Sequence, residues 1–205
     1  MTTRAIHELI DKAIARERRT HEFQRQLEPG IDALRRRLRL PEPDASAALV
    51  DFVIDYVRAA PGALDLAASV GRYLDFYDYV APFIYLAEDF FLHPVENSPN
   101  AGLQCVLREA FLAHRLIEEV NDHHMRLHQR PLLPIDMTEA NIIVHHLLGD
   151  AAAIRLESLV AATAARQLLK FPAGSEPDTS RPRSVPMPAR SRLPAPTRVR
   201  LRLEG

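Results

Sequence analysis

Apolar residues recur at every third or fourth position between Thr3 and Phe171, and prolines and glycines divide this pattern into segments of helical length. The first segment shows the spacing at Ile6, Leu9, Ile10, Ala13 and Ile14. Strand-like alternation of apolar and polar residues is not found in this part of the sequence. The pattern therefore predicts an all-α fold, a single helical bundle of about six to eight helices.

Turn-forming residues predict where these helices begin and end. We expect one helix between Asp44 and the Pro61-Gly62 turn, and an aromatic helix over 73–91 that Pro82 bends or restarts. Gly149 is a candidate break in the last helix. The remaining predicted helices cover about residues 3–26, 31–39, 63–70, 100–128 and 137–170.

The charge distribution separates a helical domain over residues 1–171 from a tail over residues 172–205. The formal net charge of the chain is −1. The tail carries seven arginines against three acidic residues, net +4, which leaves −5 for the domain. It also contains seven prolines, a composition that does not bury enough apolar surface to fold alone. We predict a disordered, basic, proline-rich C-terminal tail.

Several classes of protein are disfavoured by composition. Cys105 is the only cysteine, so an intrachain disulfide is excluded. The chain starts without the apolar core of a signal peptide and has no apolar run of about 20 residues, so we expect a cytoplasmic protein without membrane contact. Acidic residues dilute the basic run over 35–39, which argues against a nucleic-acid partner.

Histidines are concentrated in one part of the chain, since seven of the nine lie between His93 and His146. Imidazoles and carboxylates face a helical interior only when they are hydrogen-bonded, paired or bound to a metal. Helical phasing at about 100° per residue places His114 and His124 inward on the 100–128 helix. It turns Glu119 and His123 of that helix toward solvent, and phasing of the 137–170 helix turns His145 toward solvent.

Three histidine–acid pairs, each spaced i and i+4, lie near the core boundary in this phasing: Asp89/His93, His114/Glu118 and His146/Asp150. Imidazoles and carboxylates from facing helices can hold iron or manganese in a dinuclear centre that activates oxygen or water. The sequence departs from the ferritin-like pattern because these helices contain no Glu-x-x-His. The candidate metal ligands are His114, Glu118, His124, His146, Asp150, Asp89 and His93.

Two hypotheses of different class follow. The first is a metal-binding helical-bundle protein, a non-haem iron oxidase or related redox enzyme; a haem held by His93, His114 or His124 is a less favoured variant of it. The second is a non-enzymatic interaction or regulatory module in which the histidines are structural. In this second hypothesis the aromatic helix or the basic tail binds a protein partner, and an exposed aromatic face would favour a homodimer.

Overall fold

The computed structural model describes residues 2–93 and 102–170, and the structural statements below concern these residues. They fold into α-helices and one 3₁₀ turn, which confirms the predicted all-α class. The predicted tail over 172–205 lies outside the described residues. The elements are α1 (Thr2–Thr20), α2 (Glu22–Leu27), η1 (Glu28–Gly30), α3 (Ile31–Arg35), α4 (Ala45–Tyr73), α5 (Tyr77–Leu92), α6 (Leu103–His128), α7 (Thr138–Leu148) and α8 (Asp150–Lys170).

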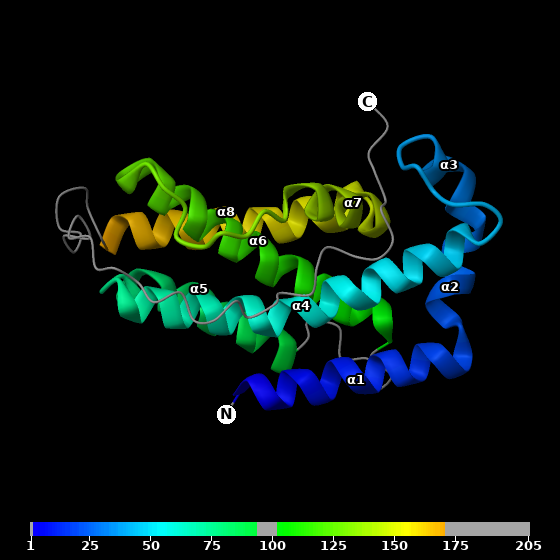
Figure 1. Cartoon of the computed structure of the whole chain (residues 1–205), viewed down its shortest axis with the longest axis horizontal. Helices are drawn as coiled ribbons and strands as arrows, with labels where there is room; N and C mark the ends of the chain where they lie inside the picture. The colour runs from blue at the N-terminus through cyan, green and yellow to red at the C-terminus, as the bar shows by residue number, and fades with distance from the viewer. Residues whose placement is uncertain (1, 94–101, 171–205) are drawn as a thin grey trace.

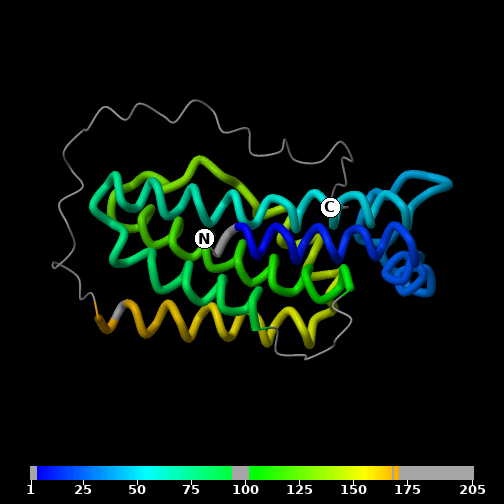
Figure 2. Tube along the Cα trace, turned by 90° about the horizontal axis from the view of Figure 1, so that it is seen from below, coloured from blue at the N-terminus to red at the C-terminus, as the bar shows by residue number. Residues whose placement is uncertain are grey.

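Helix α6 is the centre of the bundle (Figures 1 and 2). It contacts α1, α4, α5, α7 and α8. All six residues from Glu109 to His114 are buried, so this part of the helix is covered around its whole circumference. A helix buried on every side belongs to the core rather than to an amphipathic surface layer. In Figure 1, α2 and α3 lie at one end of the bundle, away from its middle.

The predicted helix over 3–26 is wrong in its length, because the chain breaks at His21, whose φ is 48°. The carboxylate of Glu17 replaces the usual N-cap side chain of α2. It accepts hydrogen bonds from the backbone N–H groups of Phe23 and Gln24, at 2.9 and 3.0 Å. The first N–H groups of a helix lack partners within the helix, so this buried carboxylate satisfies two of them.

The predicted turn at Pro61-Gly62 is also wrong, since α4 continues through both residues to Tyr73. Proline removes one backbone hydrogen bond from a helix, but burial of the surrounding apolar residues of α4 offsets that loss. Pro82 likewise lies inside α5 and does not restart it. No helix in the described residues is long and apolar enough to span a membrane.

Gly149 separates α7 from α8, as the sequence predicts. Its φ of +79° is a conformation that residues with a Cβ rarely adopt. The break gives α8 its own helical phase. A single helix over 137–170 would place Ile154 on the same stripe as Ile143 and Leu147, but Ile154 is 55% exposed because α8 has its own phase.

Replacement of Glu17 by alanine should lower the free energy of unfolding by about 2 kcal/mol, because the backbone N–H groups of Phe23 and Gln24, the first of them buried, lose their acceptor. Glu17→Gln keeps one acceptor oxygen and should have a smaller effect. Urea unfolding followed by circular dichroism measures both. Glu8→Ala is the control, since this exposed carboxylate pairs with the exposed Arg4 at the surface; its effect should stay below about 0.5 kcal/mol. Equal losses at both positions would contradict the capping role.

Candidate ligand pocket between α6, α7 and α8

The structure separates the predicted pair His114 and Glu118. Both lie on α6, but His114 Nε2 donates to the backbone carbonyl of Tyr56 on α4, at 3.1 Å. The imidazole also lies against the Tyr56 ring, with 4.5 Å between ring centroids. Burial lowers the pKa of His114 to about 4, so the side chain is neutral at neutral pH. Glu118 instead binds side chains of α6 and α7, described below.

His124 is fully buried, as predicted, and its Nδ1 donates to the backbone carbonyl of Arg130 at 2.8 Å. Burial also lowers the pKa of His124. Both inward histidines of α6 thus donate a hydrogen bond to a backbone carbonyl. The His124 contact ties the end of α6 to the connection that leads into α7.

The prediction that His123 faces solvent is wrong. Its ring is buried and stacks on Tyr79 of α5, with 4.2 Å between centroids and 10° between planes. The neighbouring Phe76 contacts His123, His124 and His128. The helical phase of α6 alone did not reveal that the first residues of α5 cover this edge.

The other candidate ligands also lie apart from His114 and His124. Asp89 and His93 form an exposed pair at 3.0 Å on the surface of α5. His146 accepts a hydrogen bond from Arg37 at 3.0 Å, and Asp150 pairs with His145 at 3.4 Å. Among residues 2–93 and 102–170, no group of three or more His, Cys, Asp or Glu residues is placed to hold a metal ion. The metal site stays a prediction.

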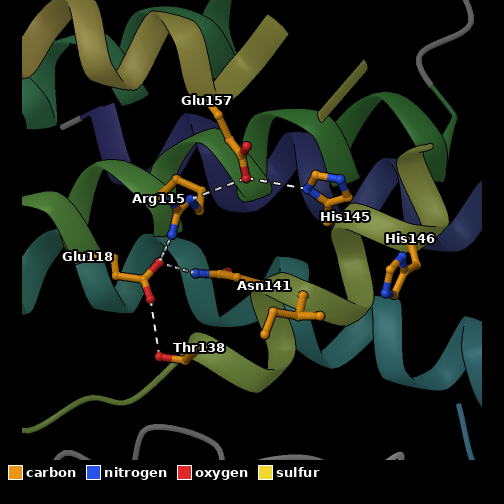
Figure 3. A pocket seen from close by; sticks show the side chains of 8 residues that line it. Arg115, Glu118, Thr138, Asn141, His145, His146 and Glu157 are labelled. Carbon is orange, nitrogen blue, oxygen red and sulfur yellow. Dashed lines mark hydrogen bonds and ion pairs between the residues drawn. The ribbon is translucent and has the colours of Figure 1, made fainter. Parts of the chain in front are cut away.

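A pocket of about 340 Å³, lined mostly by residues with polar or charged side chains, lies where α6, α7 and α8 meet (Figure 3). The volume falls within the range of small-molecule sites. Two of the predicted site residues, Glu118 and His146, line it, although they belong to different predicted pairs. The lining residues are Arg115, Glu118, Thr138, Asn141, Ile142, His145, His146 and Glu157.

One wall of the pocket is a hydrogen-bonded network built on Glu118. Its carboxylate accepts hydrogen bonds from Asn141 Nδ2 at 2.9 Å and Thr138 Oγ1 at 3.2 Å, and it forms an ion pair with Arg115. The Asn141 side-chain oxygen in turn accepts the buried hydroxyl of Tyr56, at 2.7 Å. Burial, followed by the nearby Glu118 charge, raises the pKa of Tyr56, which keeps this hydroxyl protonated.

The opposite wall is less tightly bonded. Glu157 of α8 reaches between Arg115 and His145 (Figure 3). Its Oε1 lies 3.8 Å from Arg115 Nε and 3.4 Å from His145 Nδ1. These distances exceed those of good N–H···O hydrogen bonds, about 2.7–3.2 Å. The pocket thus has one fully bonded carboxylate and one with longer contacts.

Sequence reasoning missed most of the pocket. Arg115 lies on the side of α6 that its own periodicity assigns to solvent, and α7 and α8 cover that side. His145 was also assigned to solvent, yet it is half-buried and lies between Glu157 and Asp150. The sequence does carry a local signal for the start of α7, Asp136 followed three residues later by Glu139, a spacing typical of helix N-termini. The Asp136 carboxylate accepts the Thr138 N–H at 3.0 Å.

The arrangement defines the class of the protein as an all-α bundle with a polar pocket against its central helix. No protein-family model, curated protein or solved structure matches this chain.

Tyr56→Phe should lower the free energy of unfolding by about 1–2 kcal/mol, because it leaves the buried Asn141 oxygen without its donor. Chemical unfolding of the purified variant measures this loss. Tyr85→Phe removes the same hydroxyl from a residue that is 60% exposed, and it should change stability by less than about 0.5 kcal/mol. Equal effects at the two tyrosines would show that the network contributes nothing to stability.

The lowered pKa of His114 predicts a loss of stability in acid. Between an unfolded-state pKa of about 6.5 and the folded value of about 4, the unfolded chain binds the proton and the folded chain does not. Stability from this group is fully present above the unfolded value. It falls by about 3 kcal/mol as the pH drops through that window.

Urea unfolding at several pH values tests this contribution. His114→Gln keeps a donor for the Tyr56 carbonyl but does not titrate, so its stability should fall less steeply with acid than that of the wild type. The same replacement at the exposed His7 is the matched control. An unchanged slope in His114→Gln would contradict the assignment.

Proposed function

We propose that this protein is a non-enzymatic helical binding module whose pocket between α6, α7 and α8 receives a small polar molecule. The observation that carries the proposal is the lining, in which charged and imidazole side chains from three helices meet at an open pocket of about 340 Å³. Ligand sites of this kind place a few polar groups where they fix the orientation of the ligand.

The network on Glu118 supports the proposal because it holds one wall of the pocket in a fixed geometry. Tyr56, Asn141, Glu118 and Arg115 link α4, α6 and α7 through side-chain contacts. A preformed site loses less conformational entropy on binding than a flexible one. The proposal follows the second hypothesis from the sequence in giving His114 and His124 a structural role, since each already bonds to a backbone carbonyl.

Native mass spectrometry of the protein, incubated with a small-molecule extract of its source cells, tests the proposal. We expect an added mass on the wild type that is lost in Ile142→Trp, because the larger side chain fills the pocket. Ile142 is 39% exposed, so the bundle tolerates the change. Ile154→Trp is the matched control, since this isoleucine is exposed and lies outside the lining. An added mass that both variants retain, or no added mass at all, would contradict the proposal.

A further inference from the structure

The charges of the lining are not balanced. It contains the carboxylates of Glu118 and Glu157 and the guanidinium of Arg115, a formal charge of −1 when the imidazoles are neutral. The Arg115 guanidinium forms its close ion pair with Glu118, which also accepts hydrogen bonds from Thr138 and Asn141. Glu157 is therefore the less well compensated carboxylate, because the guanidinium nitrogen nearest to it, Arg115 Nε, lies 3.8 Å away.

Glu157 is held where a ligand can reach it. About a third of its side chain is exposed, at 35%, and both of its cationic or imidazole neighbours lie at 3.4 Å or more. His145 is shared, because its other ring nitrogen lies 3.4 Å from Asp150. A half-buried carboxylate gains free energy when a cation approaches to hydrogen-bond distance.

His146 supplies a donor on the α7 side of the same pocket. Its Nδ1 accepts a hydrogen bond from Arg37, so the proton of the neutral ring lies on Nε2. Burial and the neighbouring Arg37 charge lower the pKa of His146, which favours this neutral form. Ile142 adds an apolar side chain to the lining.

We propose that the pocket selects a small organic cation, a primary amine in its ammonium form, which Glu157 binds by a charge-assisted hydrogen bond. The carbon chain of the ligand lies against Ile142, and a hydrogen-bond acceptor on the ligand receives the His146 Nε2–H. This inference rests on the proposed function and names its ligand class. An anionic ligand is disfavoured because the Arg115 guanidinium already forms an ion pair with Glu118 through Nη1, and the two carboxylates of the lining would repel the anion.

Three probes of equal carbon number test the ligand class: n-butylammonium, n-butyrate and n-butanol. The δ1-methyl NMR resonance of Ile142 reports on the pocket, and that of the buried Ile6 on α1 reports on the bundle as a whole. Butylammonium at millimolar concentration should shift the Ile142 signal in a saturable manner and leave the Ile6 signal unchanged. Butyrate and butanol should not shift either signal.

Glu157→Gln should weaken the binding of butylammonium by about tenfold or more, since the charge-assisted hydrogen bond is lost. Glu139→Gln removes an equal charge from an exposed position on α7 outside the lining, and its affinity should match the wild type. Wild-type affinity in Glu157→Gln would overturn the role of this carboxylate. The comparison of the three probes on the wild type does not depend on whether that variant folds.

The outcomes also separate this inference from the proposed function. A saturable Ile142 shift with butyrate or butanol, and none with butylammonium, would overturn the proposal of a cationic ligand. The proposal that the pocket binds a small molecule would still stand. If no probe shifts the Ile142 signal, the proposal of a cationic ligand is also overturned. The mass-spectrometric comparison of Ile142→Trp with Ile154→Trp then tests whether the pocket binds any small molecule.

Discussion

The complete burial of α6 between Glu109 and His114 is the constraint on which the rest of the structure depends. A helix that other elements surround carries its polar side chains into the core with it. Those groups destabilise the fold unless each finds a hydrogen-bond partner. His114 finds a carbonyl of α4, and His124 finds a carbonyl of the connection that follows α6. The histidines that mark this sequence thus hold neighbouring segments against the central helix.

The same requirement explains how the connection between α6 and α7 is held. Asn121 donates to the Leu133 carbonyl at 3.1 Å and accepts the Leu133 N–H at 2.8 Å. Together with the His124 contact, these bonds fix the connecting segment before α7 starts at Thr138. Asn141 and Thr138 then meet Glu118. The position of the pocket wall built on Glu118 is therefore a consequence of the hydrogen bonds that Asn121 and His124 of α6 make with the connecting segment.

The sequence predicted the fold class, the break at Gly149 and the burial of His114 and His124, because each depends on local spacing or on one residue. It failed at Pro61, where burial of the surrounding residues of α4 outweighs the local preference for a turn, and at His21, after which the Glu17 carboxylate caps a new helix. The lining of the pocket could not be predicted from the sequence, for a similar reason. Arg115 faces away from the apolar stripe of α6, and only the packing of α7 and α8 across that face makes it part of a site. Side chains of one helix can be phased from the sequence, whereas the face that a distant helix covers cannot.

The single-residue joint at Gly149 makes the pocket sensitive to chain length. Residues of α7 and Glu157 of α8 reach the same cavity from helices whose rotations are set independently on either side of this joint. One residue inserted between Gly149 and Glu157 would rotate every later side chain of α8 by about 100°, carrying that carboxylate out of the cavity. An insertion of a whole turn would nearly restore its direction. Homologous chains that keep this cavity should therefore tolerate many substitutions along the start of α8 but hardly any change in its length.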